Sequence, residues 1–122
     1  MSDVFISYAR SNARHARAAA EALRALGVSV WLDDDLPAHR VFGQEIEAQL
    51  AAAKVALVIW SDEAARSHWV LSEANRAREE QKLVQIRVDD ARLPMPFDQI
   101  HCADVGNWTG EPNHPGWMKV VA

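Results

Sequence analysis

The sequence predicts an α/β domain in which a parallel sheet is covered by helices on both faces. Short apolar runs with β-branched and aromatic residues alternate along the chain with segments of helical periodicity. The run 54–60 is almost continuously apolar, as expected for a central strand that is buried on both faces. The length of 122 residues suits one domain with a single core.

Five strands are expected, and their order follows from the connections between them. Right-handed crossovers leave few topologies, and the flavodoxin-like three-layer sandwich, with a mostly parallel five-stranded sheet in the order 2-1-3-4-5, is the natural one. Ligands of such sheets bind beyond the carboxyl ends of the strands, where strands one and three meet. The strands are predicted at Asp3–Tyr8, Val28–Leu32, Lys54–Trp60, Leu83–Val88 and, as a short edge strand, within Gln99–Val105.

Helix boundaries follow from capping residues and apolar periodicity. The first helix should end at Gly27, because glycine is the usual residue just past a helix C-terminus. The second helix should begin at Phe42 or Gly43, and the main helix should run to about Lys82. The last residues, 117–122, suggest one or two helical turns. The side chains expected to cap helix N-termini are Ser11 or Asn12, Ser61 and Ser67.

Composition and charge exclude several functional classes. The net charge is −4 and no basic cluster is present, which argues against a nucleic-acid partner. Cys102 is the single cysteine, so the chain has no internal disulfide and fits a reducing cytoplasm. The N-terminus lacks a signal-like segment and no apolar run approaches membrane-spanning length, so we expect no membrane partner and a cytoplasmic location.

Metal and nucleophile chemistry find weak support. The run Asp33–Asp35 suggests a Mg²⁺ site or the acidic pocket of a response-regulator receiver. A receiver, however, places its acids after the first and third strands, so a polar loop start with one acid pairing with Arg40 is favoured. The histidines lack metal-site spacing, and we predict no metal site. Cys102 lacks a plausible histidine partner and is expected to be a small semi-buried residue.

The segment Ser67–Glu73 is the strongest candidate for a functional site. Trp69 and Glu73 are four residues apart, so on a helix they share one face. A flat aromatic surface beside a carboxylate, at the mouth of a crevice, suits a reaction that forms a cation on a sugar next to a flat heterocycle. The alternative places Trp69 in the core and leaves Glu73 as a solvated first-turn acid that complements the helix dipole. This segment alone favours the alternative.

Four segments together resemble TIR (Toll/interleukin-1 receptor) domains over nearly the whole chain. Asp3–Tyr8, with the sequence DVFISY, looks like their first signature box, and Trp31–Gly43 resembles the end of their second strand and the following BB loop. Val55–Ser61 resembles the third strand and its serine. Trp69–Glu73 is similar to the tryptophan-to-glutamate motif of the enzymatic branch. The BB loop departs from the family, because it has Leu36-Pro37-Ala38-His39-Arg40 where many members have a proline–glycine pair.

The resemblance implies an NAD⁺ glycohydrolase of the bacterial branch. It would cleave the nicotinamide–ribose bond to give ADP-ribose or a cyclic isomer, with NAD⁺ as substrate and no cofactor. Glu73 is carried over as the catalytic residue. The implied substrate-binding residues are Trp69 and Phe42 beside the nicotinamide or ribose, Tyr8, Ala9 and Arg10 near the nucleotide, with Arg10 near its phosphates, and Ser61 as a hydrogen-bonding residue. Alternatively, Arg10 is a surface charge and Phe42 anchors the second helix in the core.

The resemblance also implies self-assembly and a larger protein. Residues 1–122 would form a single TIR domain, the N-terminal part of a longer chain with a regulatory domain, with its last helix truncated. Other copies would pack through the assembly loop, Asp35, Leu36, Pro37, Ala38, His39 and Arg40, in defence against phage or in signalling. The alternative function is a non-enzymatic TIR–TIR interaction module. A nucleoside deoxyribosyltransferase-like enzyme would also use a glutamate, but would lack the first signature box.

Overall fold

The computed structural model describes residues 3–32, 42–106, 108, 110–111 and 113–121. Within these residues, five strands form one sheet in the order β2-β1-β3-β4-β5, and all neighbouring strands are parallel. The α/β class and the 2-1-3-4-5 order predicted from the sequence are thus confirmed. The strands are β1 (Val4–Ser7), β2 (Val30–Trp31), β3 (Val55–Trp60), β4 (Leu83–Arg87) and β5 (Cys102–Asp104).

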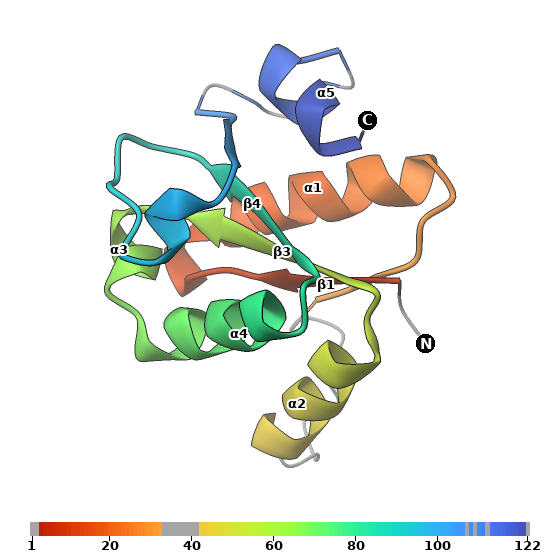
Figure 1. Cartoon of the computed structure of the whole chain (residues 1–122). Helices are drawn as coiled ribbons and strands as arrows, with labels where there is room; N and C mark the ends of the chain where they lie inside the picture. The colour runs from red at the N-terminus through yellow and green to blue at the C-terminus, as the bar shows by residue number, and fades with distance from the viewer. Residues whose placement is uncertain (1–2, 33–41, 107, 109, 112, 122) are drawn as a thin grey trace.

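Helices cover both faces of the sheet and make it the middle of three layers (Figure 1). α1 and α5 lie over one face, α4 and α2 lie on the other side, and α3 lies near the carboxyl end of β3. Among the described helices, none is long and apolar enough to cross a membrane. The helices are α1 (Ala13–Ala25), α2 (Phe42–Ala52), α3 (Asp62–Ala65), α4 (His68–Glu79) and α5 (Pro115–Val121), with short 3-10 turns at Arg10–Asn12 and Phe97–Gln99.

The core fills both faces of the central strands, because successive side chains of a strand point to opposite sides. On β1, Val4 and Ile6 pack into the cluster beneath α1 and α5, whereas Phe5 stacks on Trp31 on the other face, with ring centroids 5.3 Å apart. By the same alternation, Ser7 shares the face of Phe5. The last residue of β1 therefore presents a hydroxyl toward the layer that contains α4.

Helix ends follow the expected chemistry at three of four predicted positions. The hydroxyls of Ser61 and Ser67 accept the backbone N–H groups of Ala64 and Val70, which caps α3 and α4. Gly27 adopts φ +83°, the left-handed conformation that ends α1. The expected cap of α1 by Ser11 or Asn12 is wrong: Asn12 is the N-cap residue, but its side chain makes no cap bond. Its amide oxygen instead accepts the Ser61 hydroxyl.

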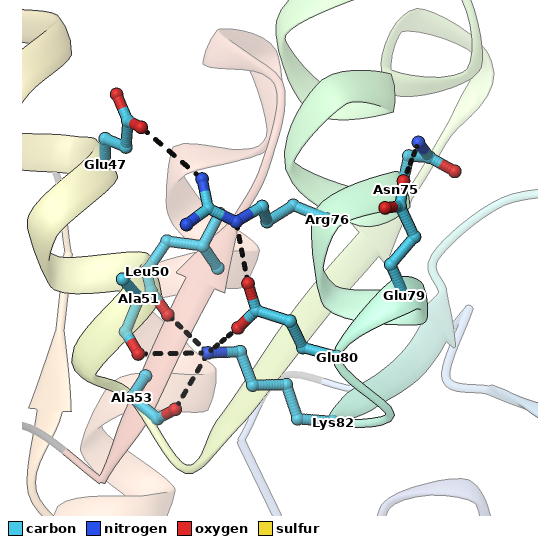
Figure 2. Close-up of polar contacts among 9 residues, drawn as sticks. All are labelled: Glu47, Leu50, Ala51, Ala53, Asn75, Arg76, Glu79, Glu80 and Lys82. Carbon is cyan, nitrogen blue, oxygen red and sulfur yellow. Dashed lines mark hydrogen bonds and ion pairs between the residues drawn. The ribbon is translucent and has the colours of Figure 1, made fainter.

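The main helix ends earlier than predicted, at Glu79 rather than near Lys82. Lys82 lies beyond the end of α4, and its side chain reaches the C-terminal end of α2. There its Nζ donates to the carbonyls of Leu50 at 2.6 Å and Ala53 at 3.0 Å (Figure 2). The same ammonium lies 3.0 Å from Oε1 of Glu80. A positive charge on the free carbonyls of a helix end is favourable, and it fastens α2 to the chain between α4 and β4.

Candidate active site

The carboxyl ends of β1 and β3 bring together the polar side chains of the candidate site. Ser7 ends β1 and pairs in register with Val58 of β3, and Ser61 follows directly after β3. α4 starts seven residues beyond Ser61, at His68, and packs against both strands. The topology therefore places Glu73 beside β1 at the edge where ligands of such sheets bind.

Glu73 is buried and held by a serine from a distant part of the chain. Its side chain is 7 % exposed, and Ser7 is 2 % exposed. The Ser7 hydroxyl donates to Oε1 of Glu73 at 2.6 Å, a bond between residues 66 apart in sequence. A buried carboxylate is costly unless hydrogen bonds compensate its lost hydration, and bonds to an ionised acceptor are short and strong. This short bond meets part of that requirement.

Trp69 lies on the same helix as Glu73 but is 48 % exposed. Both points of the alternative interpretation are therefore wrong: Trp69 is not in the core, and Glu73 is not a solvated first-turn acid. The reason is how α4 packs on the sheet. Val70, Glu73 and Ala74 are on the buried face of the helix, whereas Trp69, in the first turn, lies outside that face. The site thus has a buried acid and, one helical turn away, an open aromatic side chain.

Ser61 joins two loops of this edge. Its hydroxyl donates to Oδ1 of Asn12 at 2.6 Å and accepts the N–H of Ala64 at 3.1 Å, and its side chain is buried. Nδ2 of Asn12 also lies 3.5 Å from Nδ1 of His15. Burial, assisted by Arg14, lowers the pKa of His15 although Asp89 opposes the shift, so the neutral ring is favoured and its Nδ1 can accept. Ser61 thereby ties the loop after β1 to the loop after β3.

Three other predicted substrate residues, Tyr8, Ala9 and Arg10, follow directly after β1. Tyr8 is half-buried and packs against the cluster on the α1 face, Ala9 is buried against the cluster around Trp60, and Arg10 is exposed. The interpretation of Arg10 as a surface charge therefore agrees with its exposure, and its role near phosphates stays a prediction. The side chain of Phe42 and the assembly loop Asp35–Arg40 lie outside the described residues.

Among the described residues, neither a cluster of metal-ligand side chains nor a nucleophilic thiolate is found. In the described ranges, no three His, Cys, Asp or Glu side chains are placed to hold a metal ion. Asp33–Asp35 lie outside these ranges, so the absence of a metal site stays a prediction. Burial, the largest cause, raises the pKa of Cys102 to about 11 although Arg87 opposes the shift. At neutral pH the half-buried Cys102 is a thiol rather than a nucleophilic thiolate.

The sequence analysis missed Ser7 as a site residue. In the sequence, Ser7 is a single polar residue within an apolar strand. The one indication of its role is its spacing of two residues from Phe5. That spacing places Ser7 on the face that α4 covers. The partner could not be inferred, because nothing local in the sequence indicates which helix, and which residue of it, packs against that position.

Comparisons with known proteins agree with this architecture. The family model of the TIR domain matches residues 4–116. The TIR domain of the Toll-related receptor TRR-2 from Hydra magnipapillata is similar in structure, with a TM-score of 0.79 and 14% identity, over 88% of this chain and 86% of that one. A comparison with curated protein sequences finds no match.

Two larger proteins contain a similar fold. The TIR domains of the activated Roq1 resistosome, which recognises the pathogen effector XopQ, align with a TM-score of 0.62 and 24% identity over 73% of this chain and 60% of that one. A TIR-STING receptor from C. gigas, in complex with 2′,3′-cGAMP, aligns with a TM-score of 0.73 and 20% identity over 86% and 35%. The chain thus spans about three fifths of the first protein and a third of the second.

Proposed function

Because the chain belongs to the TIR domain family, we propose that it is an NAD⁺ glycohydrolase that cleaves the bond between nicotinamide and ribose. The observation that carries this proposal is the environment of Glu73. Its carboxylate is buried, receives a short hydrogen bond from Ser7, and lies one helical turn from the exposed Trp69. A surface acid of purely electrostatic use to the helix would be solvated instead.

The chemistry needs one carboxylate rather than two. Nicotinamide is a cationic pyridinium in NAD⁺ and takes the bonding electron pair with it, so it leaves as a neutral molecule without a general acid. The ribose carbon becomes an oxocarbenium-like cation, which water attacks to give ADP-ribose and a proton. Attack by a nitrogen of the adenine ring would give a cyclic isomer instead. Glycosidases, whose leaving group needs protonation, use two carboxylates.

The buried position of Glu73 suits this reaction. A fixed negative charge in a site that excludes water stabilises developing positive charge more than the same charge in bulk water does. The exposed ring of Trp69 offers a face on which a pyridinium could stack, and such a face attracts cations. The acid and the ring together would bind the substrate and stabilise the transition state.

We also propose that copies of the domain assemble when active, in defence or signalling, and that a further domain regulates them. Support comes from the Roq1 resistosome, an activated assembly that contains TIR domains. If competent contacts form only in the assembly, turnover per molecule should rise with concentration, since activity scales with the competent fraction. NAD⁺ turnover across a dilution series, with light scattering to report oligomers, tests this. Constant specific activity from a monomer would contradict it.

Product analysis tests the proposed reaction. The protein, at a concentration high enough for assembly, is incubated with NAD⁺ and the mixture is separated by chromatography. We expect nicotinamide in an amount equal to the NAD⁺ consumed, with ADP-ribose or a cyclic isomer as the second product. Intact NAD⁺ in a sample that forms oligomers would contradict the proposal and favour the non-enzymatic interaction module.

A further inference from the structure

We propose that Ser7 is a positioning residue whose hydroxyl fixes the orientation of the Glu73 carboxylate. This inference rests on the proposed function for its catalytic consequence, but the bond itself is a feature of the structure. The Ser7 Oγ to Glu73 Oε1 distance is 2.6 Å, and both side chains are buried. The bond joins the sheet layer to the helix layer at the end of β1 that faces the candidate site.

The two partners differ in how firmly the backbone fixes them. Ser7 lies at the end of a strand that pairs with β3 at every position from Val4 to Ser7, so its Cβ has little freedom. Glu73 has three side-chain torsions and sits on α4, which must be held against the sheet by packing. A short side chain on a strand is therefore the reference, and the longer acid is the group that is oriented.

The hydroxyl can orient the acid because its hydrogen-bonding capacity is limited. Serine has a single O–H proton, and an ionised carboxylate can only accept. That proton is donated to Oε1, which restrains the position of one oxygen of the Glu73 carboxylate. A catalytic group displaced by about 1 Å can lose a factor of about 100 in rate, so this restraint has a measurable consequence.

Three variants of Ser7 separate the hydrogen bond from the volume of the side chain. Ser7→Ala removes the hydroxyl, Ser7→Cys keeps the size but offers only a weak donor, and Ser7→Thr keeps the hydroxyl. The matched control is Ser29→Ala. It removes a serine hydroxyl that accepts the N–H of Asp3 at 2.8 Å, near the opposite end of the same strand.

Steady-state kinetics with NAD⁺, corrected for the folded fraction, give the main result. We expect Ser7→Ala and Ser7→Cys to lower kcat about 10- to 100-fold with KM within about threefold, in line with a lost bond to a charged group. Ser7→Thr should recover most of kcat, and Ser29→Ala should stay within about twofold of wild type. A folded Ser7→Ala variant with kcat within twofold of wild type would overturn the inference while the proposed function stands.

A second measurement keeps the inference testable if the wild type does not cleave NAD⁺ at all. Thermal unfolding is compared for wild type, Ser7→Ala, Glu73→Met and the double variant. If the hydroxyl restrains the carboxylate, Ser7→Ala should lower Tm clearly in the wild-type background and much less beside Met, because the bond is already gone. Equal losses in both backgrounds would overturn the inference. Absence of NAD⁺ cleavage, by contrast, refutes only the proposed function.

Discussion

Two glutamates about two turns apart on and just after α4 are held in opposite ways. In the middle of α4, Glu73 is buried, and a neutral hydroxyl donates to it. Just past the C-terminal end, Glu80 is exposed and lies between two cations, with Oε2 at 2.7 Å from Nε of Arg76 and Oε1 at 3.0 Å from Nζ of Lys82 (Figure 2). The same side chain thus meets two environments within two helical turns.

The difference is between a buried carboxylate that a neutral hydroxyl contacts and an exposed carboxylate that two cations contact. Arg76 and Lys82 satisfy Glu80, and Arg76 also pairs with Glu47 of α2, so this end fastens two helices together. The Glu73 carboxylate accepts a bond from the neutral hydroxyl of Ser7 and is buried. A negative charge held in a buried site can stabilise a positive charge that develops in a substrate. Environment, rather than residue type, therefore marks Glu73 as the candidate.

Shortening each glutamate by one methylene should give a large contrast in NAD⁺ turnover. Glu73→Asp keeps the charge but withdraws it from its position, and we expect NAD⁺ turnover to fall roughly 100-fold, the scale of a misplaced catalytic group. Glu80→Asp should leave turnover within about twofold. Turnover per folded molecule of both variants is the measurement. Equal effects at the two positions would remove the functional distinction between Glu73 and Glu80.

Removing the contact between Lys82 and the end of α2 should lower the free energy of unfolding. Lys82→Met removes an ammonium that binds carbonyls at the end of α2, on a side chain that is 8% exposed, and a lost bond to a charged group costs about 2 kcal/mol. Lys54→Met is the control, because its pair with Asp3 is exposed and should matter by less than about 0.5 kcal/mol. Urea unfolding gives both values. If the Lys82 and Lys54 variants had the same free energy of unfolding, the contact between Lys82 and the end of α2 would not stabilise the fold.

Removing the exposed ring of Trp69 tests whether this side chain contributes to substrate binding. We expect Trp69→Ala to lower turnover about tenfold, since an aromatic face contributes roughly 1 kcal/mol or more to binding a cation. Its cost in stability should be well below the roughly 3–5 kcal/mol typical of a truncated core aromatic, because the side chain is half exposed. Denaturation and NAD⁺ kinetics on the same samples separate the two effects. A large loss of stability with intact turnover would return Trp69 to a packing role.

The smallest effect concerns pH. The hydrogen bond from Arg76, with Lys82 assisting, lowers the pKa of Glu80 below its ordinary value of 4.5. A lowered pKa in the folded state contributes stability above the unfolded value, and this contribution is lost as pH falls through the folded value. The stability difference between wild type and Glu80→Gln should therefore be constant near neutral pH and shrink below about pH 4. A difference that does not change down to pH 3 would contradict the ion pair.

Sequence periodicity and capping chemistry predicted most of the fold. The strand runs, Gly27 and the caps at Ser61 and Ser67 act locally, within a few residues of the structure they determine. The errors involve partners distant in sequence: Asn12 does not cap α1 because Ser61, 49 residues away, takes its amide oxygen. The main helix stops short of the residue that binds the end of α2.

The candidate site was predicted in part for the same reason. Spacing places Trp69 and Glu73 on neighbouring turns of one helix, and this is local. Which of the two is buried depends on how α4 rotates against the sheet, and Ser7 meets Glu73 only through that packing. Helical spacing alone therefore favoured the wrong assignment, a buried ring and a solvated acid. The segment Asp35–Arg40 lies outside the described residues, so its role in assembly stays a prediction.

Nicotinamide release by wild type, Glu73→Gln and Glu80→Gln, at equal folded concentration, tests the central claim most directly. Glutamine keeps the shape of each side chain and removes its charge. We predict that Glu73→Gln loses about 100- to 1000-fold in turnover, the scale of a missing electrostatic stabiliser of about 3–4 kcal/mol. Glu80→Gln should retain turnover. A folded Glu73→Gln variant that releases nicotinamide at nearly the wild-type rate would contradict the assignment of Glu73 as the catalytic carboxylate.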